Sequence, residues 1–149
     1  MNIRQALMSG ATGATSLTLL HETARQFVPH APRVDVLGIR AIAASLRAVD
    51  QTPPSRDSLY WLAMAGDLVS NSLYYSLVGV GDREGVWRRG ALLGAAAGIG
   101  AVIVPRLVGL GKQPNQHTPE TQIMTCLWYL AGGLAASAAA SALQRSGTE

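Results

Sequence analysis

Residues 58–80 read SLYWLAMAGDLVSNSLYYSLVGV, a long and mostly apolar stretch with Asp67 and Asn71 near its middle. A helix of about 20 apolar residues spans the ~30 Å hydrocarbon layer of a bilayer. We therefore predict that this stretch crosses a membrane. An ionisable group at that depth is costly and marks a functional site or a partner on a neighbouring helix. The prediction of a site in this protein therefore starts from Asp67.

The composition favours an integral membrane protein. Charged residues make up 14% of the 149-residue chain, whereas soluble domains contain about 25%. Hydrophobic residues make up 48% of the chain, and few of them are aromatic. A soluble, alanine-rich helical protein is the alternative, but the length of the apolar runs argues against it. The basic residues are scattered along the chain rather than clustered, so we expect no nucleic-acid partner.

Outward from residues 58–80, the sequence predicts an all-α fold in a single membrane domain over residues 1–149. Between the first two spans, residues 33–50 carry an Arg at every seventh position, which predicts an amphipathic helix lying along the membrane interface. Residues 112–119 are predicted to form an exposed loop and residues 145–149 a frayed tail. In architecture alone, this multi-pass pattern resembles small proteins of the bacterial inner membrane. The four predicted transmembrane helices cover residues 3–27, 58–80, 86–104 and 121–143.

Small residues recur at helical spacing in two of these spans. Gly90, Gly94 and Gly98 follow one another at intervals of four, and Gly10 and Gly13 lie near the start of the chain. Small residues at such spacing let two membrane helices approach closely. These faces are therefore predicted to pack helices together, either inside one chain or in a homodimer. The other predicted partners are membrane lipids.

The depths of the charged residues predict a polar pocket between helices. At 1.5 Å per residue, Glu22 lies about 8 Å and Asp67 about 13 Å from the same membrane surface. We expect the pocket to open toward the segment 28–57, with the Arg40 face of the amphipathic helix as its roof. The alternative is that Asp67 and Asn71 only join helices through hydrogen bonds. The candidate ligand-binding residues are His21, Glu22, Arg25, Arg40, Asp67, Asn71, Tyr74 and Tyr75.

Three classes of function fit this pattern. We favour a protein that binds or transports an ion, a proton or a small polar or amphiphilic molecule, rather than an enzyme. A membrane enzyme acting on a lipid is the second class, with Glu22, His21 and Asp67 as acid and base candidates. The third is an accessory subunit whose polar groups only fix its fold. No metal-ligand, phosphate-loop or dinucleotide motif is present, so we expect no metal and no cofactor.

Overall fold

The computed structural model describes residues 1–111 and 118–146. In this part of the chain there are five α-helices and no strand: α1 (Ile3–Phe27), α2 (Val34–Ala48), α3 (Arg56–Ser76), α4 (Val86–Leu107) and α5 (Pro119–Ser146). A single 3-10 turn, η1 (Leu77–Gly79), continues α3. The predicted all-α class is confirmed for these residues. Residues 112–117 of the predicted loop and 147–149 of the predicted tail lie outside the described residues.

Local sequence explains where α1 ends and α3 begins. α1 ends at Phe27, and Val28 takes the extended conformation that is favoured before a proline such as Pro29. The hydroxyl of Ser55 accepts a hydrogen bond from the backbone N–H of Ser58 at 3.3 Å. This bond caps α3 by satisfying one of the free N–H groups in its first turn.

α4 extends three residues beyond its predicted end. The predicted span covers residues 86–104, with Pro105 expected to bend or end the helix, and in the structure the helix runs on to Leu107. Pro105 has no N–H and therefore costs the helix one hydrogen bond. The following turn is closed by the N–H of Val108, which donates to the carbonyl of Val104 at 3.1 Å. A proline this close to the helix end is therefore tolerated.

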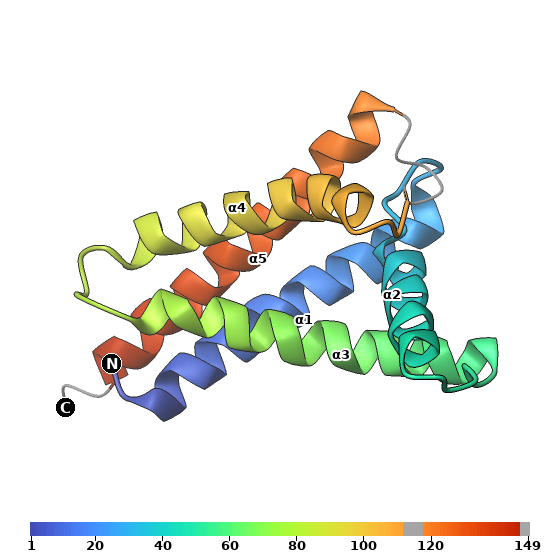
Figure 1. Ribbon diagram of the computed structural model, residues 1–149. Helices are drawn as coiled ribbons and strands as arrows, with labels where there is room; N and C mark the ends of the chain where they lie inside the picture. Colours follow the sequence, from blue (N-terminus) through green and yellow to red (C-terminus); the bar gives the residue numbers. More distant parts are fainter. Residues whose placement is uncertain (112–117, 147–149) are drawn as a thin grey trace.

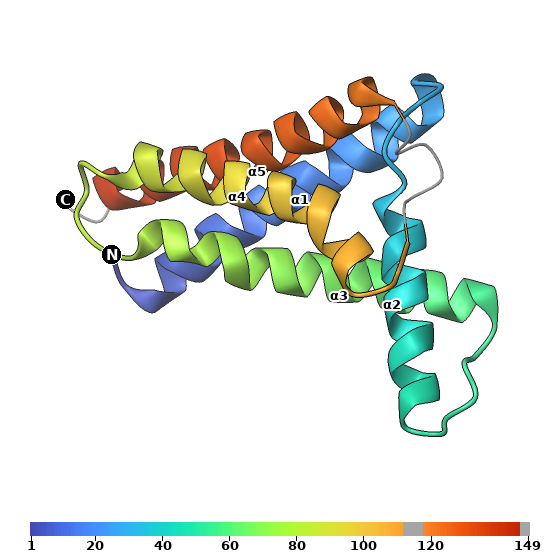
Figure 2. The same ribbon diagram turned by 45° about the horizontal axis from the view of Figure 1, so that its top comes forward.

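Four of the helices form a bundle, and the fifth lies across one end of it. α1, α3, α4 and α5 run along the length of the molecule, with both termini at the same end (Figure 1). Gln5 joins the two terminal segments by donating through Nε2 to the carbonyl of Leu143 at 3.1 Å. α2 lies across the opposite end, where it packs on α3 (Figure 2).

Glycines let α4 and α5 approach closely. A Cβ atom added to Gly94 would lie 2.7 Å from the Cα of Leu130, and one added to Gly98 would lie 2.7 Å from the Cα of Cys126. Gly90 is also buried against α5. The predicted stripe of glycines therefore packs two helices inside one chain.

The small residues of α1 serve the same purpose. Gly10 faces the backbone of Ser72 and Ser76 on α3, and Gly13 faces Gly132 on α5. Both predicted small-residue faces are thus occupied within the chain. A homodimer stays a prediction, and it would have to use another surface.

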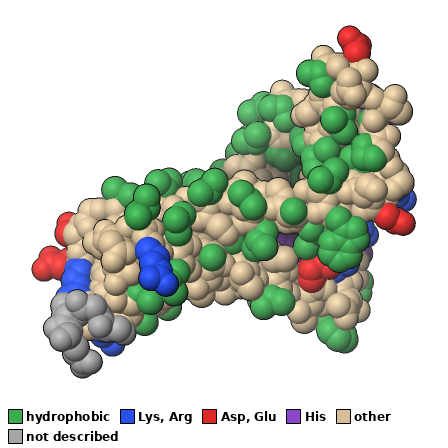
Figure 3. All heavy atoms as spheres, turned by 90° about the horizontal axis from the view of Figure 1, so that it is seen from below, with side chains coloured by type: hydrophobic (Ala, Val, Ile, Leu, Met, Phe, Trp, Pro, Cys, Tyr) green, Lys and Arg blue, Asp and Glu red, His purple; other side chains and the backbone are tan. Residues whose placement is uncertain are grey.

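Small and hydroxyl-bearing side chains fill much of the interior, while large apolar side chains lie outside. Trp61 is 70% exposed, Leu73 57% and Leu92 63%. On the face drawn in Figure 3, charged side chains lie mostly toward the two ends, and hydrophobic ones are dispersed among other atoms over the stretch between them. Soluble proteins bury their large aliphatic residues, so this distribution suits a lipid environment better than water. The largest fully buried side chains are Tyr75, Leu17, Val78, Val86, Thr121, Thr125, Ser9 and Ser137.

Among the described residues, two helices are long and apolar enough to cross a membrane. They are α4 and the segment Pro119–Arg145 of α5. α1 and α3 are not among them. Length and composition therefore give weak support to the prediction of membrane spans, and only for these two helices.

Arg89 fastens the turn between η1 and α4. Its Nε donates to the carbonyl of Val78 at 3.1 Å, and its Nη1 lies 3.3 Å from the carboxylate of Asp82. The same carboxylate accepts the backbone N–H of Gly85 at 2.7 Å. These two hydrogen bonds, the one from Gly85 first, hold the pKa of Asp82 below its ordinary value. Arg89 therefore ties this turn together.

Candidate functional site

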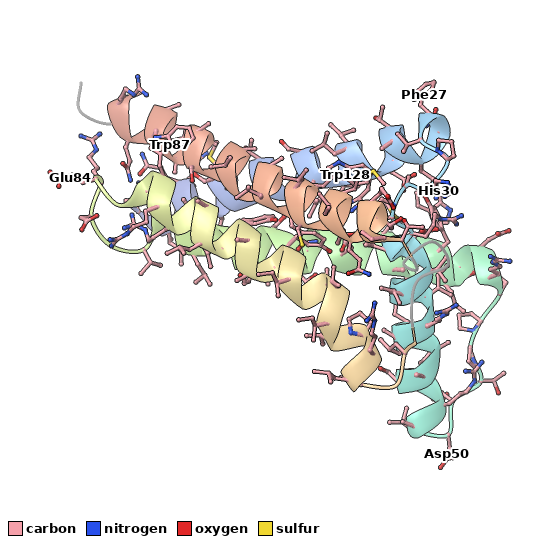
Figure 4. The ribbon with its side chains drawn as sticks, turned by 90° about the horizontal axis from the view of Figure 1, so that it is seen from above. Phe27, His30, Asp50, Glu84, Trp87 and Trp128 are labelled. Carbon is pink, nitrogen blue, oxygen red and sulfur yellow. The ribbon has the colours of Figure 1, made fainter. Side chains whose placement is uncertain are left out.

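A cavity of about 500 Å³ lies between α1, α2, α3 and α4, with Tyr129 of α5 in its wall. It lies toward the end of the molecule where Figure 4 shows Phe27 and His30, away from Glu84 and Trp87 at the other end. Both termini lie at that other end. The cavity is therefore on the side of the bundle that α2 closes.

One face of α1 supplies four polar side chains to the cavity: Thr18, His21, Glu22 and Arg25. Their spacings of three, four and seven residues place them on the same side of a helix. Three of them were predicted as site residues from the sequence. Thr18 was missed, although it completes the same helical spacing.

Arginines compensate two of the three carboxylates in the cavity wall. Arg25 binds Glu22 at 2.6 Å and Asp35 at 3.4 Å. Arg33 holds Asp35 with two bonds, from Nε at 2.9 Å and from Nη2 at 2.8 Å. Glu22 also accepts the hydroxyl of Tyr60 at 3.3 Å. This network ties α1 to α2 and α3 at the cavity wall.

Asp35 keeps its charge because of these arginines. Burial raises the pKa of this carboxyl, but the hydrogen bonds and charge of Arg33, together with the charge of Arg25, outweigh burial and leave the pKa below its ordinary value. The prediction from the sequence did not include Asp35. The only signal was its position two residues after Arg33, on the helix that was expected to roof the pocket.

Asp67 reaches the cavity from α3. Its carboxylate accepts one hydrogen bond, from the side-chain amide of Asn71 at 2.9 Å. No Lys, Arg or His among residues 1–111 and 118–146 forms an ion pair with it. Because Asp67 and Asn71 lie on the same helix, their bond does not join two helices. Asn71 holds the carboxylate in place and is itself not part of the cavity wall.

Two polar atoms of the cavity wall are buried without a hydrogen-bond partner. They are Nε2 of His21 and Oγ1 of Thr18. The imidazole of His21 is held edge-on by two rings of α5, with centroid distances of 5.1 Å to Trp128 and 5.7 Å to Tyr129. Buried polar atoms are nearly always paired. Nε2 of His21 and Oγ1 of Thr18 are therefore two acceptors of the cavity wall that no group of the chain satisfies.

Four of the predicted site residues lie outside the cavity wall: Asn71, described above, and Arg40, Tyr74 and Tyr75. Arg40 is exposed, and its Nη1 donates to the carbonyl of Leu110 at 3.2 Å. α2 does close one side of the cavity, but it does so through residues such as Leu37 and Gly38. A long guanidinium side chain keeps its charge at the surface, whereas the inner side of α2 carries small and apolar residues.

Tyr74 and Tyr75 join helices instead of facing the cavity. The hydroxyl of Tyr74 donates to the carbonyl of Leu93 on α4 at 2.9 Å. The hydroxyl of Tyr75 donates to the carbonyl of Tyr129 on α5 at 2.7 Å, and its side chain is fully buried. Their place in the structure is the packing between α3, α4 and α5.

Comparison with protein-family models, with curated proteins and with solved structures found no match for this chain. Within the described part of the chain, no three or more His, Cys, Asp and Glu side chains are grouped so as to hold a metal ion.

Proposed function

We propose that this chain is a multi-pass membrane protein whose cavity binds or transports a small polar or amphiphilic molecule. The observation that carries the proposal is the cavity of about 500 Å³, in which charged groups from three helices meet apolar walls. Ligand sites of small molecules have volumes of about 300–1,000 Å³ and mostly apolar walls with a few placed polar groups. The cavity has these properties.

The proposal includes four membrane spans, with α1 and α3 beside α4 and α5. At 1.5 Å per residue, α1 is about 37 Å long and α3 about 31 Å, enough for the ~30 Å hydrocarbon layer. α1 and α3 also expose large apolar side chains, among them Leu19 and Leu73. Their charged residues Glu22, Arg25 and Asp67 line the cavity, where a bundle interior tolerates them. α2 would then lie at the interface, and a bacterial inner membrane remains the proposed location.

The arginines argue against the alternative of an enzyme that acts on a phospholipid. Such a site needs a guanidinium that is available to a phosphate. Arg25 and Arg33 are already bound by carboxylates, and Arg40 lies outside the cavity wall. The alternative of a purely structural role is also disfavoured, because His21 and Thr18, both in the cavity wall, each have a buried polar atom that no group of the chain satisfies.

A substitution that fills the cavity tests this function. Ala101 lines the cavity from α4, and Ala101→Trp would place an indole in the ligand's space. Ala96→Trp, on an exposed position of the same helix, is the matched control. We expect a small molecule to be released on denaturing the purified wild-type chain. Its amount should fall about tenfold or more in Ala101→Trp, corresponding to at least about 1.4 kcal/mol of lost binding.

Mass spectrometry of the released small molecules, at equal amounts of folded protein, provides the measurement. The same molecule should be released from Ala96→Trp in wild-type amount. Equal release from all three proteins, or none from the wild type, would contradict a ligand-binding cavity.

A further inference from the structure

The charges around the cavity are unevenly compensated. Glu22 and Asp35 each have an arginine within 2.8 Å, whereas Asp67 has only the neutral amide of Asn71. Asp67 is half-buried in α3, and it lines the same cavity as Tyr129. A carboxylate in a partly apolar cavity is costly unless a cation is paired with it. The cavity therefore lacks one positive charge.

The unpaired atoms of α1 have the hydrogen-bonding character that a cation requires. His21 is 6% exposed, and its Nε2 accepts a hydrogen bond when the proton of the neutral ring is on Nδ1. Oγ1 of Thr18, three residues earlier on the same helix, also accepts. Tyr129 lies beside His21, with 5.7 Å between the centroids of the two rings, and it also lines the cavity.

From these observations we infer that the ligand is a primary amine with an apolar body, bound as its ammonium form. This inference rests on the proposed function and names the ligand class of the same cavity. The ammonium carries one positive charge and three N–H donors, which match the Asp67 carboxylate, His21 Nε2 and Thr18 Oγ1. The apolar body lies against residues such as Leu37, Met64 and Val104.

Other ligand classes fit less well. A carboxylate or phosphate would add negative charge beside Asp67. A neutral alcohol would pair with His21 or Thr18 and leave Asp67 without a cation. A divalent metal ion needs several oxygen or nitrogen ligands in one place, and the described residues hold no such group.

Three probes with the same apolar body test the inference: 4-phenylbutylamine, 4-phenylbutanol and 4-phenylbutyrate. Each probe is measured by equilibrium dialysis against the full chain in phosphatidylcholine nanodiscs, and binding to empty nanodiscs is subtracted. We expect the amine to bind the wild type about tenfold or more tightly than the alcohol, because a charge-assisted hydrogen bond is added. We expect no binding of the acid above empty nanodiscs.

Two variants locate the cationic group. Asp67→Asn should lower the affinity for the amine to the level of the affinity for the alcohol. The affinity for the alcohol itself should not change. Asp57→Asn removes an exposed carboxylate at the start of the same helix and should change neither of these two affinities. Thr18→Val keeps the side-chain shape and disrupts no hydrogen bond of the chain. Thr18→Val should lower the affinity for the amine about fivefold, the usual contribution of one hydrogen bond.

The outcomes separate this inference from the proposed function. The inference would be overturned if the wild type bound the alcohol or the acid as tightly as the amine, or if it did not bind the amine at all. A molecule without an amino group that is lost in Ala101→Trp would also overturn it, while supporting the proposed function. If Asp67→Asn does not fold, the wild-type order of the three probes and the effect of Thr18→Val decide the question.

Discussion

Gly94→Ala is expected to destabilise the folded chain by about 1–3 kcal/mol, the usual cost of overpacking a close contact. The added Cβ would lie 2.7 Å from the Cα of Leu130 and 2.8 Å from the carbonyl oxygen of Tyr129. Both are backbone atoms, so the contact can be relieved only by moving α4 away from α5. The measurement is the free energy of unfolding in detergent, with helical circular dichroism as the signal.

Gly100→Ala is the control for this prediction. Gly100 lies on the same helix, and a Cβ added there would meet nothing within 4 Å. Alanine is the better helix former by about 1 kcal/mol, so this variant should be as stable as the wild type or more stable. Equal loss of stability in both variants would mean that α4 and α5 do not pack through Gly94.

Tyr75→Ala is expected to cost about 3–5 kcal/mol, as is usual when a large core aromatic residue is truncated. Tyr75 is fully buried, and its hydroxyl holds α3 to α5 through the carbonyl of Tyr129. Tyr75→Phe isolates this hydrogen bond and should cost about 0.5–1.5 kcal/mol. Leu73→Ala, at an exposed position two residues earlier, should cost about 1 kcal/mol or less. Unfolding in detergent again provides the measurement.

This result would also decide between two roles for Tyr75. A packing residue lowers stability when it is truncated, and Tyr75→Phe should leave ligand binding unchanged. Loss of ligand binding in Tyr75→Phe at wild-type stability would show that Tyr75 belongs to the binding site after all.

The sequence was most informative about which segments are helical. Helix α1 begins and ends at the two bounds predicted for it, residues 3 and 27. Helical spacing and distance from the membrane surface also indicated that His21, Glu22, Arg25 and Asp67 lie in the same half of the bundle. All four line one cavity in the structure.

The rotation of each helix about its own axis was harder to predict. Tyr74 and Tyr75 are only a few residues from Asp67, yet they face neighbouring helices because α3 crosses α4 and α5 at that level. Arg40 and Asp35 lie on the same helix, and the structure turns Asp35 toward the cavity and Arg40 away from it. Such orientations depend on contacts between distant segments, which helical periodicity does not contain.

For the glycine stripe too, the sequence pattern predicted a contact without identifying the helix that makes it. The spacing of Gly90, Gly94 and Gly98 predicted a close helix crossing, but it did not specify which helix approaches. The partner is α5 of the same chain. Its small residues, such as Gly133 opposite Gly90, complete the close approach.

The central claim is that α3, with Asp67 on its inner side, lies within the hydrocarbon of a membrane. A nitroxide spin label at Val69→Cys tests it, in a chain whose single cysteine is replaced by Cys126→Ser. Val69 is 60% exposed and lies two residues from Asp67. In liposomes, the account predicts that oxygen reaches this label far better than a water-soluble nickel complex does. A label at Glu84→Cys, in the exposed turn before α4, should show the reverse. If the label at position 69 is as accessible to nickel as the label at position 84, α3 is in water and the account is wrong.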